Sequence, residues 1–188
     1  MPRGLILFYI LTCLTSCAKW QQPDIIEPLK LIPLAAPLGP SRRIVQQISA
    51  IWANKQDVLL CVIELNKQRI AIAGLSLDGL SLFNLSYDGN ALSLKKSPLL
   101  PTAFAPEFII KDLQLAYWPL ANLQKTMPTP WHIEAKPDHR HLYFNNQLIS
   151  DVEYLQPDAA WPRSIALSNH QFHYKLLIKT ISYEALPE

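Results

Sequence analysis

Residues 58–95 have the sequence VLLCVIELNKQRIAIAGLSLDGLSLFNLSYDGNALSLK, and this stretch decides the fold. It contains four short segments rich in Leu, Ile and Ala, at 58–65, 69–75, 80–87 and 91–95. The breaks between them hold Asn66-Lys67, Asp78-Gly79 and Asp88-Gly89-Asn90, residue types that tight hairpin turns favour. The stretch therefore predicts four consecutive strands of an antiparallel meander. The first of them is apolar on both faces.

Further strands are expected on both sides of this meander. Before it, 43–52 predicts a first strand, and 54–57 a turn. After residue 130, strands are expected at 131–135, 141–145, 148–154 and 171–183, with Asn145-Asn146 as a hairpin tip. In the strand at 148–154, side chains alternate between the two faces of the sheet, so Asp151 and Glu153 are expected to point outward. Leu148, Val152 and Tyr154 are expected to point inward. The same alternation in the last strand places four residues on one face, namely Phe172, Tyr174, Leu176 and Ile178.

The residues between the two groups of strands predict a helix. Pro106 suits a first helical position, and Glu107 complements the helix N-terminus. Apolar residues then recur at helical spacing, at Ile109, Leu113, Ala116, Tyr117 and Leu120. Because the polar stripe is thin, we expect this helix to be buried on most of its circumference against the sheet. Pro119 should end or kink it, and a short second helix is expected to carry Leu120, Leu123 and Met127.

These elements predict one domain of the α+β class, mainly β, at 41–188. Its centre is a strongly curved antiparallel sheet of about eight to ten strands, interrupted once by a helical insertion. A chain of 188 residues with 49% apolar residues can bury one substantial core.

The N-terminus indicates export. Arg3 is followed by the apolar run 5–11, which is too short to span a bilayer and is typical of a secretory signal. Leu14-Thr15-Ser16-Cys17 resembles the lipobox of bacterial lipoproteins, so we expect a signal peptide at 1–16 and acyl chains on Cys17. An ordinary signal peptide with a chance cysteine is the alternative. Residues 17–40 form a Pro-rich tether, and Ala18, in place of a retaining Asp, favours the outer membrane with the domain facing the periplasm.

The sequence gives little support to catalysis or metal binding. The segment 74–78, GLSLD, lacks the second glycine of a nucleophile elbow, and Cys61 lies in an apolar run that predicts a buried, inert thiol. His139 and His141 share one face of a strand without a third ligand, and His170 and His173 are expected on opposite faces. The net charge of +2 argues against nucleic acid. We therefore expect no catalytic residue, metal or cofactor, and no enzymatic activity.

Apolar surface is abundant and suggests a ligand cavity between the sheet and the helix. The alternative for each of these residues is that it belongs to the core. The candidate ligand-binding residues are Trp52, Leu60, Val62, Phe83, Phe104, Phe108, Leu113, Tyr117, Trp118, Trp131, Tyr174 and Leu176.

Two motifs carry a resemblance to a known family. Residues 106–120, PEFIIKDLQLAYWPL, and residues 141–149, HLYFNNQLI, are similar to a bacterial lipoprotein family known only as a domain of unknown function, DUF3261. The strand around Tyr174 also fits, and the likeness covers most of 41–183. That family looks distantly related to the outer-membrane lipoprotein localisation factors, whose fold is an unclosed β-barrel with a helical lid over an apolar cavity. Members of the DUF3261 family are often encoded beside genes for aryl polyene or fatty-acid-like synthesis.

The resemblance implies a carrier or acceptor for a lipid-like product. We therefore expect a non-enzymatic outer-membrane lipoprotein that binds acyl chains, an aryl polyene or the acyl chains of a lipoprotein, with a periplasmic carrier protein as a candidate partner. The competing hypothesis is a structural or adaptor lipoprotein that recruits a partner protein of an envelope lipid biosynthesis system.

Overall fold

The computed structural model describes residue 30 and residues 41–53, 55–100, 105–156 and 162–187. Within them the chain forms ten strands and two helices. The expected signal peptide, the lipidation site Cys17, the tether apart from Lys30, and the candidate residue Phe104 lie outside the described residues.

All ten strands belong to one antiparallel sheet with the order β5-β4-β3-β2-β1-β10-β9-β8-β7-β6. The first and last strands along the chain, β1 and β10, are therefore neighbours at the centre of the sheet. The strands are β1 (Arg42–Trp52), β2 (Lys55–Leu65), β3 (Ile70–Ser76), β4 (Ser81–Tyr87), β5 (Leu92–Lys96), β6 (Trp131–Lys136), β7 (His139–Phe144), β8 (Gln147–Tyr154), β9 (Ser164–Asn169) and β10 (Tyr174–Ala185).

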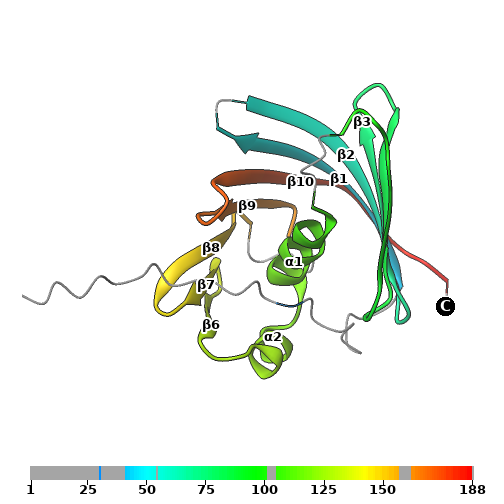
Figure 1. Cartoon of the computed structure of the whole chain (residues 1–188). Coiled ribbons are helices and arrows are strands. Elements are labelled where there is room, and N and C mark those ends of the chain that lie inside the picture. The colour runs from blue at the N-terminus through cyan, green and yellow to red at the C-terminus, as the bar shows by residue number, and fades with distance from the viewer. Residues whose placement is uncertain (1–29, 31–40, 54, 101–104, 157–161, 188) are drawn as a thin grey trace, which may run out of the picture.

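The sheet is strongly curved and does not close, because among the described strands β5 and β6 each pair on one side only (Figure 1). Register shifts between Val45 and Gln46, between Gly74 and Leu75, and between Leu142 and Tyr143 add local bends. At the second of these shifts the Phe83 ring lies over Gly74, where a Cβ atom would collide with it. Glycine at position 74 thus lets an aromatic side chain pack directly against the backbone of β3.

Helix α1 (Pro106–Tyr117) lies in the concavity of the sheet, and α2 (Leu120–Thr126) follows it near β6 (Figure 1). As expected, α1 begins at Pro106, and Pro119 separates the two helices. Glu107 is the exposed residue of α1, and every other residue of the helix is buried or half-buried. Among the described residues, no helix combines the length and the hydrophobicity needed to cross a bilayer.

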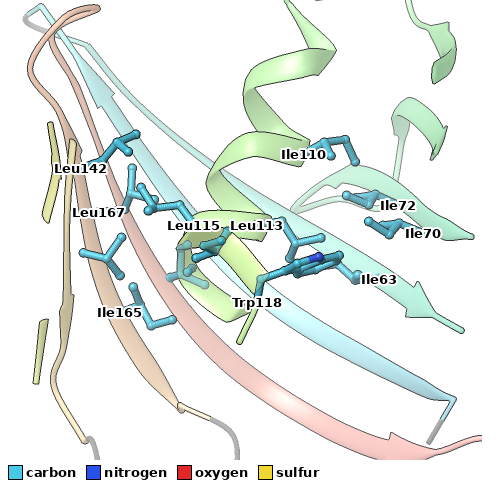
Figure 2. Close-up of a cluster of buried hydrophobic side chains, with 14 of the residues drawn as sticks. Ile63, Ile70, Ile72, Ile110, Leu113, Leu115, Trp118, Leu142, Ile165 and Leu167 are labelled. Atoms are coloured by element: carbon cyan, nitrogen blue, oxygen red, sulfur yellow. The ribbon is translucent and has the colours of Figure 1, made fainter. Parts of the chain in front are cut away.

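The core lies on both sides of α1 (Figure 2). Ile63, Ile70 and Ile72 of the sheet face α1 from one side, while Leu142, Ile165 and Leu167 face it from the other. Between these two groups lie side chains from α1 and its C-terminal cap, namely Ile110, Leu113, Leu115 and Trp118. The helix therefore acts as the shared centre of two half-cores, one against β1–β4 and one against β6–β9.

Three parts of the predicted strand pattern were wrong, wholly or in part. The sequence prediction missed β9, and it began the last strand at residue 171. Residues 170–173 instead form the turn between β9 and β10, with His173 in the left-handed region at φ 54°. Phe172 therefore lies exposed in this turn, and His170 and His173 do not lie on opposite faces of a strand. The predicted turn at 54–57 was also wrong in part, since β2 begins at Lys55.

Candidate functional site

The C-terminus of α1 is tied to the sheet by a charged side chain that points into the concavity. Arg140 of β7 donates hydrogen bonds from Nη1 to the carbonyl oxygens of Leu115 and Trp118, both at 2.8 Å. The last carbonyls of a helix have no partner within the helix, and they carry the negative end of its dipole. A cation at this place satisfies two of them and permits the helix end to be buried.

Two further bonds hold the same region of α1. The Tyr154 hydroxyl of β8 donates to the Ala116 carbonyl oxygen at 2.6 Å. The Gln46 amide of β1 donates to the Tyr117 hydroxyl at 2.7 Å. Side chains from both halves of the sheet therefore fix the end of one apolar helix.

A second polar cluster lies further back along α1. The Tyr174 hydroxyl of β10 donates to Oδ2 of Asp112 at 2.7 Å, and the Asn169 amide donates to that hydroxyl at 3.4 Å. Oδ1 of Asn169 in turn accepts a hydrogen bond from the backbone N–H of Phe172 at 2.9 Å. Burial raises the pKa of Asp112 to about 7, although Tyr174 and the nearby Lys111 act in the opposite direction. This carboxyl group therefore changes charge close to neutral pH.

A pocket of about 110 Å³ lies between the helices and the β6–β9 half of the sheet. Its apolar walls come from Leu115, Leu123, Trp131, Leu142 and Ile149, and Phe108 and Phe172 lie at its outer edge, 4.4 Å apart between ring centroids. Polar groups lining it include Lys111, Asp112, Gln114, Ser150, Asn169 and Gln171, together with Lys30. The pocket thus combines an apolar interior with a small set of polar atoms, which is typical of small-molecule sites.

The structure divides the predicted cavity residues into several groups. Phe108 and Trp131 line this pocket, and Tyr174 reaches it through Asp112. Phe83, Leu113 and Trp118 are buried core residues, and Tyr117 and Leu176 are half-buried against that core. Trp52 is partly exposed and lies, with Tyr174, beside a separate shallow hollow at the β9–β10 turn.

Leu60 and Val62 do not reach the concavity. Cys61, Ile63 and Leu65 are the buried residues of β2, and alternation along the strand places Leu60 and Val62 on the opposite, convex face. The sequence could not assign the faces because the strand is apolar on both.

Sequence reasoning did not single out the polar groups of the site. Asp112 lies within the helix motif 106–120 and Arg140 lies between His139 and His141, but the sequence predicted a role for neither. The alternation of β7 was the available signal for Arg140, since it places this residue on the same face as the apolar Leu142 and Phe144. The partners of Asp112 and Arg140 could not be inferred, because they lie on other elements.

The other reactive side chains considered in the sequence are histidines and a cysteine. Among the described residues, no group of three or more His, Cys, Asp or Glu residues has metal-binding geometry. His139 and His141 share one face, as predicted, and stack with ring centroids 4.5 Å apart. Cys61 is buried, and desolvation raises the pKa of its thiol to about 12, as expected for an inert cysteine.

These observations define a class of protein. It is an open, strongly curved antiparallel sheet with an apolar helix fixed in its concavity and a small pocket beside that helix. The chain belongs to the family described as "Protein of unknown function (DUF3261)", whose model matches residues 43–182. The resemblance found in the sequence is therefore confirmed.

One solved structure with a similar fold comes from Vibrio parahaemolyticus. It is a crystal structure of a domain proposed to be an outer membrane lipoprotein-sorting protein. The two chains share 9% sequence identity with a TM-score of 0.45, over 79% of this chain and 88% of the other. No curated protein matches the chain significantly.

The bonds from Arg140 give a first prediction. Arg140→Met should lower the free energy of unfolding by about 2–3 kcal/mol, because two buried helix carbonyls lose charged donors. Hydrogen exchange of the α1 backbone amides should accelerate in parallel. The control is Arg69→Met, a change at an exposed arginine between β2 and β3, for which we expect less than about 0.5 kcal/mol. Equal effects of the two substitutions would contradict the role assigned to Arg140.

The raised pKa of Asp112 gives a second prediction. Between pH of about 4, where an unfolded aspartate ionises, and pH of about 7, the folded protein holds a proton that the unfolded chain has released. The contribution of Asp112 to the free energy of unfolding should therefore fall as the pH rises through this window. Urea unfolding of Asp112→Asn should lack this loss and show a gain over the wild type at neutral pH. The exposed Asp57→Asn serves as control, and parallel pH profiles for wild type and Asp112→Asn would contradict the prediction.

Proposed function

We propose that this protein is a non-enzymatic lipoprotein that binds a hydrophobic chain in the pocket between α1, α2 and the β6–β9 half of the sheet. The candidate ligands are acyl chains, an aryl polyene or the acyl chains of a lipoprotein. This protein would hold them as a carrier or acceptor in the periplasm. The observation that supports this proposal most is the position of the pocket. It lies beside α1 on one side, where the walls are Leu115, Leu142 and Ile149. A periplasmic carrier protein is the partner that this function calls for.

The volume of the pocket indicates how a chain would enter. About 110 Å³ is less than the roughly 300–1,000 Å³ of most ligand sites, so a long chain needs additional room. Leu123 is the only residue of the seven-residue α2 that is fully buried, and Met127 follows the helix. Both side chains line the pocket. Displacement of α2 would therefore enlarge the pocket, while the bonds from Arg140 and Tyr154 keep α1 in place.

Burial would provide the driving force for binding. Each methylene group moved from water into the pocket contributes about 0.8 kcal/mol. The exchange of a chain between the protein and a membrane depends on the difference between two apolar environments, so it can proceed in either direction.

The competing hypothesis is an adaptor, and one observation favours it. Leu77, Leu80 and Leu99 are exposed, the first two in the turn between β3 and β4 and the third just after β5. Exposed apolar residues near one another are a common feature of protein-binding surfaces. A protein of this kind would remain folded and fail to bind any hydrophobic probe.

The location of the protein is a further part of the proposal. The lipobox-like Leu14-Thr15-Ser16-Cys17 supports removal of residues 1–16 and acylation of Cys17. Ala18 supports sorting to the outer membrane, where the domain would face the periplasm. Two or three acyl chains are sufficient for stable anchoring.

Filling the pocket should prevent binding. Ser150 is buried in the pocket wall, and Ser150→Leu places a larger apolar side chain into the space. We expect the affinity for the neutral fluorescent probe N-phenylnaphthylamine to fall by about tenfold or more. The matched control is Ser86→Leu, because Ser86 lies on the convex face between the buried Leu85 and Tyr87. Unchanged affinity in folded Ser150→Leu, or equal losses in both variants, would place the probe elsewhere.

Removing the acylated thiol should release the protein from the membrane. Cys17→Ser should abolish incorporation of labelled palmitate and shift the protein from the outer-membrane fraction to a soluble or unprocessed form. Cys61→Ser serves as control, since Cys61 is buried in the core. Continued palmitate labelling of Cys17→Ser would contradict the assignment of the anchor.

A further inference from the structure

One wall of the pocket carries a carboxyl group that the burial of an apolar chain does not explain. Asp112 lines the same pocket as Leu115, Leu142 and Ile149. Its Oδ2 atom accepts the Tyr174 hydroxyl, and desolvation opposes its ionisation. Tyr174 satisfies only Oδ2, so a chain without a polar end would leave the other carboxyl oxygen, Oδ1, without a donor when it displaced water. The ligand is therefore expected to bring a donor of its own.

The carboxyl group is held in a fixed orientation. Tyr174 donates to it at 2.7 Å, and the Asn169 amide donates to the Tyr174 hydroxyl. Asn169 is itself fixed by the backbone N–H of Phe172, in the turn that also carries Phe172 to the edge of the pocket. This chain of bonds runs from the β9–β10 turn to α1, so the acceptor is preorganised before a ligand arrives.

The neighbouring ammonium group is placed differently. Lys111 also lines the pocket, but its Nζ atom lies 5.6 Å from the centroid of the Phe108 ring, at the outer edge. A long, flexible side chain over an aromatic ring fixes a charge less firmly than a hydrogen-bonded carboxyl group does. Lys111 would attract an anionic head, whereas Asp112 would attract a hydrogen-bond donor or a cation.

We propose that the pocket selects a hydrophobic chain whose head is a hydrogen-bond donor, an amine or a hydroxyl, and that Asp112 receives this head. The inference rests on the proposed function and specifies its ligand class. A carboxylate head would meet the acidic group in an apolar surrounding, where like charges repel strongly. Tyr174 is a positioning residue, since it acts through Asp112.

Displacement of bound N-phenylnaphthylamine by decylamine, decanol and decanoate tests this selection in the full chain at pH 8. These competitors share an alkyl chain and differ in the head. We expect decylamine to bind about tenfold or more tightly than decanoate. The net charge of the chain is +2, so general electrostatic attraction would favour the acid and cannot produce this order.

Three variants assign the preference to its source. Asp112→Asn keeps an acceptor for Tyr174 and should reduce the ratio of amine to acid affinity to near unity, while decanol still binds. Tyr174→Phe should reduce the ratio in part. Lys111→Gln should leave the preference for the amine in place.

The outcomes separate the two proposals. If decanoate binds best, or if Asp112→Asn leaves the ratio unchanged while all three competitors bind, the head selection is wrong and the hydrophobe-binding function stands. A shift of the ratio in Lys111→Gln alone would assign selection to the lysine and overturn the role of Asp112. If the wild type binds neither the fluorescent probe nor any competitor, the proposed function fails as well.

Discussion

The structure depends on the hydrogen bonds that satisfy the carbonyl groups at the buried C-terminus of α1. Every residue of this helix except Glu107 is buried or half-buried, so it is stable only where both of its sides are covered, in the concavity of the sheet. Burying it there also buries its last carbonyl groups, which would destabilise the fold without donors. Arg140 and Tyr154 supply those donors from β7 and β8. An inward-pointing arginine in a strand, which would otherwise be a buried charge without a partner, is thereby stabilised.

This arrangement makes the two sides of α1 unequal. Toward β1–β4 most of the contacts are made by branched aliphatic and aromatic side chains, among them Ile63, Ile72 and Phe83. The buried Gln46 adds one polar contact there, its hydrogen bond to Tyr117. Toward β6–β9 the polar Ser150 and Asn169 lie among the apolar side chains, and they line a pocket together with Leu142 and Ile149. The side of the molecule that supplies the donors for the helix carbonyls is thus also the side that has room for a ligand.

Local sequence signals were sufficient for most of the fold. Pro106 and Pro119 defined the helix boundaries, and Asn145-Asn146, both in the left-handed region, formed the predicted hairpin tip. The strand β9 was missed because SIALSN is short, with polar residues at both ends, and the turn after it contains Phe172, which continues the apolar pattern of β10. The pocket could not be predicted in detail. Asp112 meets Tyr174 62 residues further along the chain, and Leu60 faces away from the concavity, because curvature and register decide both.

The most direct test of the central claim is to locate a bound chain on the protein. A decylamine analogue carrying a photoreactive diazirine near the end of its chain can be crosslinked to the full-length protein and mapped by peptide mass spectrometry. Binding beside α1 predicts crosslinks to the pocket walls, in the peptides that contain Leu115, Leu142 and Ile149. Crosslinks confined to the exposed leucines at Leu77, Leu80 and Leu99, or to Leu60 and Val62 on the convex face, would contradict it.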